Sequence, residues 1–262
     1  MVLAAVAAIE FDWPGVASLG VILSVFMVFE YDRMWSQEQK LGLLGFWRVL
    51  AVPSVLTAFC YYKQFPAYYF AALLLIIFGI SLGIDILRER QRPILRNLSP
   101  IYIGLGVMSI LWIYRDFGGF ALAFIFLITI SNDVGAYLTG RSLKGAGPKL
   151  APDISPNKTL FGAIGGVIVA FAIVTSYVIM ALWNRGVDSV QVVSIIGAVT
   201  ILLSILSICG DLFESKMKRL CGVKDSSSII PGHGGFLDRF DSILFVAPAF
   251  AALISARILM PI

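Results

Sequence analysis

Charged residues are scarce in this sequence: Asp, Glu, Lys and Arg together make up 14% of the 262 residues, against roughly 25% in soluble globular domains. Hydrophobic residues make up 59%, and the mean hydropathy is +0.90. This composition excludes a water-soluble fold with an ordinary polar surface and indicates that the bilayer is the solvent. We therefore attribute the net charge of +4 to basic residues in the loops on one side of the membrane, and we expect no nucleic-acid partner.

Residues that form disulfides or bind zinc are also few. Cys60, Cys209 and Cys221 lie far apart without C-x-x-C spacing, and His233 is the single histidine. The pattern implies neither a disulfide framework nor a zinc site. The sequence also lacks G-x-x-x-x-G-K-[ST] and a dinucleotide fingerprint, so nucleotide binding would use another scaffold.

Long hydrophobic runs account for most of the chain. A helix needs about 20 apolar residues to cross a hydrocarbon core of about 30 Å, and eight runs are long enough. They cover residues 14–31, 43–62, 67–87, 98–114, 118–139, 161–183, 190–210 and 242–260. Residues 1–9 are apolar but too short to cross. We therefore predict an all-α, polytopic integral membrane protein with eight full transmembrane helices and a short N-terminal partial helix. No repeat or linker divides the chain, so residues 1–262 are predicted to form a single helical membrane domain.

Basic residues alternate between the gaps that separate these runs. The first, third, fifth and seventh gaps hold 15 of the 20 Lys and Arg residues, and cytoplasmic loops are the ones that retain basic residues. These gaps are predicted to face the cytoplasm, with the C-terminus on the opposite side. The compact chain suits a bacterial inner (plasma) membrane.

The region 132–241 carries the two longest polar loops, both on the predicted cytoplasmic side. If the seventh helix continues past its apolar run, Asp211, Glu214, Ser215 and Lys218 share one helix face. A carboxylate at membrane depth is costly unless it is paired, hydrated or bound to a cation. Asp211 is thus either part of a functional site or an interfacial charge paired with a nearby lysine or arginine.

A second set of polar residues follows in Pro-Gly-His-Gly-Gly-Phe-Leu-Asp-Arg-Phe-Asp, residues 231–241. Glycines around His233 let the backbone approach a bulky anion. Asp238 and Asp241 would share a face and could meet Asp211, although helix capping explains one of them equally well. Carboxylates without a His/Cys set suit magnesium, and neighbouring lysines and arginines suit phosphate. The pattern favours phosphoryl or nucleotidyl transfer onto a membrane-resident substrate.

The other long loop contributes a weaker cluster. Asp133 lies near the cytoplasmic end of a predicted span, and Lys158 follows in the loop. Asp133 could belong to a polar network within the membrane or to a ligand site. Gly162 and Gly166 form G-x-x-x-G, which is typical of close helix packing.

The run Ser-Lys-Met-Lys-Arg at 215–219, Lys224-Asp225, and the segment 231–241 together resemble the signature of the phosphatidate cytidylyltransferase (CDP-diacylglycerol synthase) family, with every fixed position matched. The resemblance extends through residues 210–214 and parts of 133–159, and thus covers roughly the C-terminal half. It implies a magnesium-dependent enzyme, with a second cation left open, that makes CDP-diacylglycerol and pyrophosphate from CTP and phosphatidate. It also implies a homodimer.

The resemblance assigns roles to individual residues. Asp211 and Asp238, with Asp241 close by, would hold the metal. Lys218 and Arg219 would hold phosphate groups, and Ser215 could bond a phosphate or a metal-bound water. The expected catalytic residues are Asp211, Asp238, Lys218, Arg219 and Ser215. The expected substrate-binding residues are Asp133, Lys158, Lys224, Asp225, His233, Gly234, Gly235 and Arg239. Phe161 stands where the family commonly has a glutamate, and the N-terminus is shorter than usual.

Two other functions remain open at this stage. A CTP-dependent lipid kinase would transfer the γ-phosphate and release CDP. An ion-coupled transporter would use Asp133, Asp211 and Asp238 as cation sites, although polar residues at one mouth, rather than at the midplane, argue against it.

Overall fold

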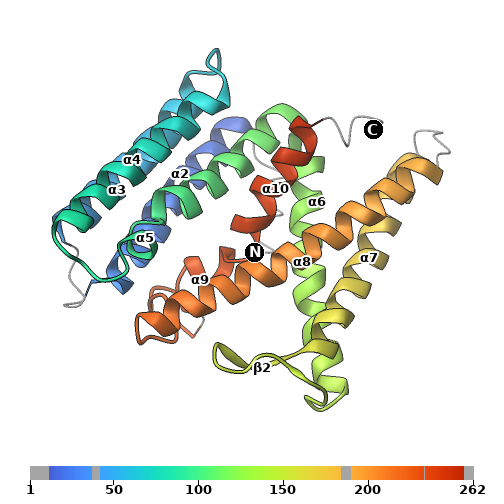
Figure 1. The fold of residues 1–262 in the computed structure, drawn as a ribbon. Helices are drawn as coiled ribbons and strands as arrows, with labels where there is room; N and C mark the ends of the chain where they lie inside the picture. The colour runs from blue at the N-terminus through green and yellow to red at the C-terminus, as the bar shows by residue number, and fades with distance from the viewer. Residues whose placement is uncertain (1–11, 37–41, 184–189, 233, 257–262) are drawn as a thin grey trace.

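The computed structural model describes residues 12–36, 42–183, 190–232 and 234–256. The described chain is almost entirely helical (Figure 1). Its helices are α2 (Trp13–Met34), α3 (Leu43–Tyr61), α4 (Ala67–Leu87), α5 (Pro93–Arg96), the π-helix η1 (Pro100–Leu105), α6 (Gly106–Ser142), α7 (Leu160–Trp183), α8 (Val190–Leu220), α9 (Leu237–Phe240) and α10 (Ile243–Ser255). Six helical segments in the described residues are long and apolar enough to cross a membrane, which confirms the all-α membrane class.

The count of eight full transmembrane helices is not confirmed. The two runs predicted at 98–114 and 118–139 form one helical segment, Pro100–Ser142. Its helix α6 contains a sharp kink at Gly118, whose φ of 77° and ψ of −176° are non-helical and are accessible to glycine because it has no Cβ. The last run, predicted at 242–260, forms the 13-residue helix α10, shorter than a full crossing. The predicted partial helix at 1–9 and the end of the last run lie outside the described residues.

The structure adds a two-stranded hairpin that the sequence analysis did not predict. Strands β1 (Lys149–Ala151) and β2 (Ser155–Thr159) pair antiparallel, with Lys149 opposite Thr159 and Ala151 opposite Ser155. Each strand is too short to show an alternating pattern. The hairpin leads directly into α7, so it places Lys158 beside the polar end of α8.

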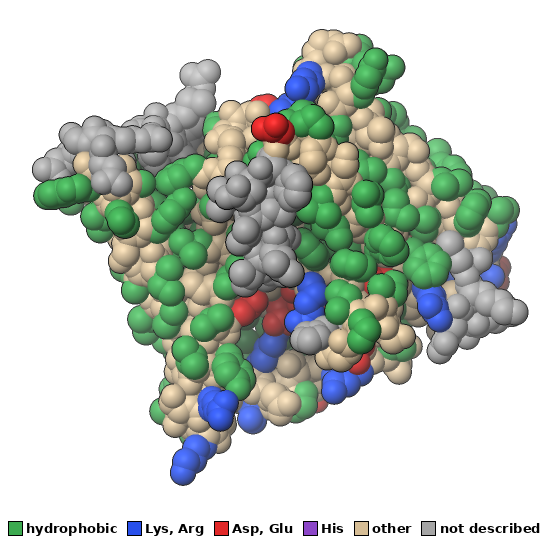
Figure 2. All heavy atoms as spheres, turned by 180° about the vertical axis from the view of Figure 1, so that it is seen from behind, with side chains coloured by type: hydrophobic (Ala, Val, Ile, Leu, Met, Phe, Trp, Pro, Cys, Tyr) green, Lys and Arg blue, Asp and Glu red, His purple; other side chains and the backbone are tan. Residues whose placement is uncertain are grey.

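The gaps predicted to be cytoplasmic lie toward one end of the helices. The ends of α2, α4 and α8 and the β hairpin lie along the lower side in Figure 1. From the opposite direction, hydrophobic side chains cover most of the face, and many of the visible Lys and Arg side chains lie toward its lower edge (Figure 2). A hollow near this edge contains acidic side chains. The arrangement agrees with the alternation of basic gaps along the sequence.

A buried polar network joins the N-terminal helices. Arg48 of α3 donates from Nε to Asp32 of α2 at 3.0 Å and also bonds Asn97. Asn97 in turn donates to Asp85 of α4 at 2.9 Å, and Ser99 donates to Asp32 at 3.1 Å. Charges inside a membrane protein are costly unless paired, so this network fixes α2, α3 and α4 around the segment that follows α5.

Helices α6 and α7 pack closely through glycines. A Cβ on Gly166 would lie 2.6 Å from the carbonyl oxygen of Asn132, and one on Gly165 would collide with Thr139. This is the close packing that the G-x-x-x-G pattern predicted. It brings the start of α7, and the hairpin before it, against the polar end of α6.

Candidate active site

The polar end of α8 forms the first part of the site. The helix continues to Leu220, so Asp211, Glu214, Ser215 and Lys218 share a face as predicted. Lys218 Nζ lies 2.5 Å from Glu214 Oε2, and Ser215 Oγ donates to Asp211 Oδ1 at 3.4 Å. Glu214 is 1% exposed, so its carboxylate is held in the protein interior beside a lysine.

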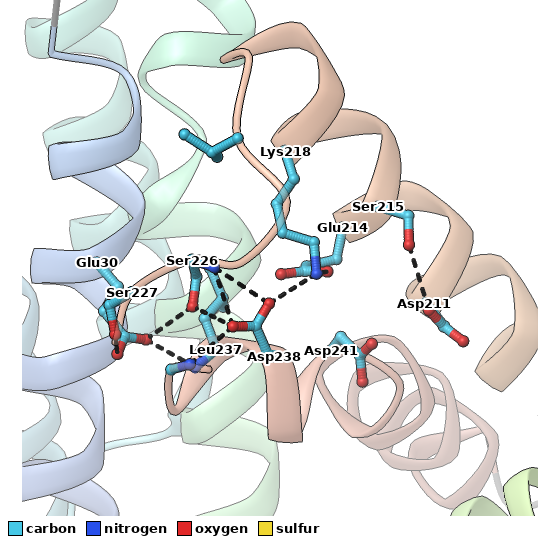
Figure 3. A network of polar contacts seen from close by, with 12 residues as sticks. Glu30, Asp211, Glu214, Ser215, Lys218, Ser226, Ser227, Leu237, Asp238 and Asp241 are labelled. Carbon is cyan, nitrogen blue, oxygen red and sulfur yellow. Dashed lines mark hydrogen bonds and ion pairs between the residues drawn. The ribbon is translucent and has the colours of Figure 1, made fainter. Parts of the chain in front are cut away.

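Asp238 is surrounded by hydrogen-bond donors (Figure 3). Its Oδ1 accepts from Lys218 Nζ at 2.6 Å, and its Oδ2 accepts from the amides of Ser226 and Gly235 at 2.9 and 2.7 Å. The Ser226 hydroxyl adds a bond at 2.8 Å. Burial raises the pKa of Asp238, but the bonds from Lys218 and Gly235 outweigh it and lower the pKa to about 2. The side chain is therefore an ionised clamp that ties α8 to the glycine-rich loop.

Glu30, which the sequence analysis missed, holds the same loop from the other side. This fully buried carboxylate of α2 accepts from the amides of Phe236 and Leu237 at 3.0 and 2.8 Å and from the Ser227 hydroxyl at 2.6 Å. It lies in a run predicted as an apolar span, and nothing in a single sequence pairs it with a loop about 200 positions later. The one available signal was that Glu30 is a carboxylate inside a hydrophobic run, because ionisable residues within membrane spans usually have a functional role.

Gly235 occupies the narrow space between these two carboxylates. A Cβ at this position would collide with Ser226 Oγ and would lie 2.5 Å from Glu30 Oε1. We expect Gly235→Ala to displace the loop, to lower stability by about 1–3 kcal/mol, and to reduce activity by up to roughly a hundredfold, the effect of misplacing catalytic groups by about 1 Å. Thermal unfolding and initial rates measure both effects.

The control for this variant is Gly79→Ala in α4, where a Cβ would meet no atom within 4 Å. It should leave both quantities near their wild-type values. Full activity and an unchanged melting temperature in Gly235→Ala would show that a methyl group fits beside Glu30 and Ser226, and would contradict the close packing at Gly235.

Three carboxylates gather on the other side of Lys218. Asp211 pairs with Lys158 from the β hairpin. Burial, and then the charges of Asp211 and Asp133, raise the pKa of Asp241 to about 8, while the hydrogen bond from the Ser242 amide and the charge of Lys158 lower it by less. The Asp241 carboxylate also accepts from the Ser242 amide at 2.7 Å. Asp133, Asp211 and Asp241 thus form an acidic cluster with Lys158 as its close cation.

The acidic cluster offers carboxylates of the kind that magnesium takes. Among the described residues, no group of three or more His, Cys, Asp or Glu side chains is arranged to coordinate a metal, but magnesium usually takes one or two carboxylates and completes its shell with water and substrate phosphates. Asp211 and Asp241 supply such a pair. Gly210 allows the approach, because a Cβ there would lie 2.9 Å from the Asp241 carbonyl oxygen.

A cavity of about 490 Å³ adjoins the acidic cluster. Its polar wall includes Asp133, Lys158 and Asp211, and its apolar wall includes Leu150 and Ile208. A cavity with a charged end and a hydrocarbon side suits a ligand that carries a phosphate on an acyl chain.

The remaining predicted site residues lie in different surroundings. Arg219 donates to the backbone carbonyls of Ile154 and Val223 at 3.3 and 3.4 Å, and so ties the hairpin to the end of α8. Lys224, Asp225 and Arg239 are exposed, Gly234 has a left-handed φ of 80°, and His233 lies outside the described residues. Phe161, which replaces the usual glutamate, packs so closely on Gly147 that a Cβ on that glycine would contact its ring. The roles assigned to these residues by resemblance stay predictions.

Fold and site together define a helical integral membrane protein whose carboxylates and lysines meet at one end of its helices. A family profile described as the Cytidylyltransferase family matches residues 1–256. The chain belongs to this family.

Proteins named phosphatidate cytidylyltransferase are similar to part of this chain. The protein from Helicobacter pylori strain J99 is 40% identical over 157 residues, which are 60% of this chain and 55% of that protein. The Bacillus subtilis strain 168 protein is 41% identical over 155 residues, 58% of this chain and 54% of the relative. The Staphylococcus saprophyticus protein is 42% identical over 157 residues, which are 60% of this chain and 57% of that protein. The matched region spans about half the length of these relatives.

Proposed function

We propose that this protein is a CTP:phosphatidate cytidylyltransferase that makes CDP-diacylglycerol and pyrophosphate. The observation that carries the proposal is the meeting of the acidic cluster, Lys158 and the Lys218–Asp238 pair beside a cavity with an apolar wall. The names of the relatives support the same reaction. The family profile and the position of the polar groups at one end of the helices favour this enzyme over a transporter.

The reaction joins a phosphate oxygen of phosphatidate to the α-phosphorus of CTP while the bond to the β-phosphate breaks. The lipid phosphate is already ionised, so no general base is needed and no covalent enzyme intermediate forms. The protein's task is to position the substrates and stabilise charge. Lys218 has three N–H donors and uses two on Glu214 and Asp238, which leaves one for a phosphate oxygen. Lys158 acts similarly from the hairpin.

Magnesium is proposed as the cofactor, held by Asp211 and Asp241 with Asp133 nearby. When bound, it neutralises charge on the nucleotide phosphates. The resemblance also suggests Asp238 as a metal ligand, and this role stays a prediction. Both oxygens of Asp238 already accept hydrogen bonds from protein groups, so we do not include it in the proposed magnesium site.

The membrane arrangement completes the proposal. The basic end of the helices faces the cytoplasm of a bacterial inner membrane, and the protein works as a homodimer. The Pro100–Ser142 segment crosses twice with its turn at Gly118. Light scattering of the detergent-solubilised protein measures the oligomer directly.

Pyrophosphate release tests the function. The purified protein should release pyrophosphate only when CTP, phosphatidate and magnesium are all present. Omission of phosphatidate should stop release, and diacylglycerol should not replace it. Pyrophosphate release without lipid, or transport of an ion without nucleotide, would contradict the proposal.

The pKa of Asp241 predicts how stability depends on pH. Its folded-state pKa is about 8 against an ordinary value of 3.8, so the folded protein keeps a proton that the unfolded chain has lost. This contribution to stability is full below about pH 4 and is lost as the pH rises toward 8 and above. In EDTA, the melting temperature should therefore fall between pH 5 and pH 9.

Asp241→Asn should flatten this decline, and magnesium should offset it in the wild-type protein at high pH, because metal binding favours the ionised carboxylate. Asp153→Asn, in the exposed turn of the hairpin, is the matched control and should keep the decline. An equal slope in Asp241→Asn and wild type would exclude Asp241 as the titrating group.

A further inference from the structure

A second pocket is lined in part by Ser226, whose hydroxyl bonds Asp238. Its volume is about 410 Å³, and it is formed by the end of α2, the loop before α5, the end of α8 and the serines that follow. Three arginines line it, Arg33, Arg92 and Arg96, against one acidic residue, Asp225. Three consecutive hydroxyl side chains, Ser226 to Ser228, complete the polar wall.

The guanidinium groups of this arginine pocket differ in how fully they are engaged. Arg96 is committed to the protein, since it pairs with Asp85 at 3.3 Å and donates to the Trp35 carbonyl at 2.6 Å. Among the described residues, Arg92 donates only to the Leu220 carbonyl, at 3.5 Å. Arg33 and Arg92 are exposed, and neither forms an ion pair within the described part of the chain.

The backbone holds Arg92 in place at a conformational cost. Its φ and ψ of 52° and 51° are left-handed, a region that side chains other than Gly, Asn and Asp seldom adopt. Such strain persists where surrounding contacts determine the conformation, and it gathers at ligand sites. Arg92 lines the pocket from this strained position.

We propose that the arginine pocket binds a phosphate-bearing anion at a site separate from the acidic cluster. Arginine donors in a fork match phosphate oxygens two at a time. The exposed Ser228 hydroxyl adds a neutral donor, whereas the hydroxyls of Ser226 and Ser227 donate to Asp238 and Glu30. The anion comes from a soluble polyphosphate such as pyrophosphate or from the headgroup of an anionic phospholipid. Ser226 links the pocket to the site, because it also bonds Asp238.

Binding of inorganic pyrophosphate tests the proposal without relying on the enzymatic activity. Calorimetry is carried out on the full chain in a neutral detergent with EDTA, so that no divalent cation bridges the anion to the carboxylates. Arg33→Gln and Arg92→Gln should each weaken binding roughly tenfold, and the double variant about a hundredfold, as expected for loss of charged hydrogen bonds.

The control is Arg88→Gln, an exposed arginine of the same loop that lies outside the pocket. It removes the same charge and should change binding less than twofold. The lipid source is tested in parallel with dihexanoyl phosphatidylglycerol below its micelle concentration. Selective weakening of pyrophosphate binding supports a soluble anion, and selective weakening of the short-chain lipid supports a headgroup.

Equal binding of both probes by the double variant and by Arg88→Gln would overturn the arginine pocket as an anion site, as would no binding of either probe to wild type. Arg33→Gln alone keeps the test valid if the double variant misfolds, because its side chain is exposed and unpaired among the described residues. Failure of these tests leaves the cytidylyltransferase proposal intact, because no step of the assay uses CTP turnover.

Discussion

Asp211→Asn is expected to reduce cytidylyl transfer by roughly a thousandfold, the upper range for losing one preorganised charge-stabilising group. The substitution keeps the shape of the side chain but removes the charge that pairs with Lys158 and that faces Asp133 and Asp241. The site then loses both a proposed magnesium ligand and the partner that positions Lys158. Initial rates at saturating CTP and phosphatidate measure the loss.

Asp153→Asn is the matched control for this experiment, because it removes the same charge from the exposed turn of the same hairpin. It should retain wild-type rates. Asp211→Asn should still purify as a monodisperse protein, since Asp211 is partly exposed and the asparagine side-chain oxygen still accepts from Lys158 Nζ. Activity within tenfold of wild type would remove Asp211 from the proposed magnesium site.

Asp238→Asn is expected to lower the rate by roughly a hundredfold or more and to destabilise the fold as well. The asparagine amide places donors against at least one of the groups that now donate to the carboxylate, Lys218, Ser226 and Gly235. An unsatisfied buried group costs about 1–3 kcal/mol. The loop would then lose its connection to α8, with a larger effect on kcat than on KM, because the defect lies in positioning.

Magnesium binding distinguishes the proposed roles of Asp211 and Asp238. In the absence of substrates, magnesium should raise the melting temperature of wild type and of Asp238→Asn, but not of Asp211→Asn, because Asp238 is occupied by protein donors. A magnesium response that vanishes in Asp238→Asn while the folded protein survives would instead make Asp238 a metal ligand, as the signature suggests.

Much of the fold could be predicted because lipid imposes a simple length rule. The bounds of α4 and the start of α8 agree with the apolar runs, and α8 extends past its run because Asp211, Glu214 and Lys218 still fit a helical face. The bend at Gly118 lies beside the gap predicted between the runs 98–114 and 118–139. The short α10 could not be predicted, because hydropathy measures how apolar a run is and not how far a helix continues.

The site was predictable in composition but less so in geometry. The signature contains Lys218 and Asp238, the cost of a carboxylate at membrane depth drew attention to Asp211, and local spacing correctly placed Asp211 and Lys218 on one face. Glu30 could not be assigned, because its partners are backbone amides of a loop that is distant in sequence. The sequence likewise does not show that Asp238 holds the loop while Asp241 belongs to the acidic cluster. That difference depends on which donors face each carboxylate oxygen, and only the tertiary structure determines it.

The most direct test of the central claim follows the phosphorus atoms of CTP. Parallel reactions with phosphatidate and magnesium use CTP labelled at the α- or the γ-phosphate, with Asp211→Asn as the inactive reference. We expect the α-label to enter the lipid phase as CDP-diacylglycerol and the γ-label to appear in aqueous pyrophosphate. A γ-label in the lipid, with the α-label left in aqueous CDP, would show a lipid kinase and would contradict nucleotidyl transfer.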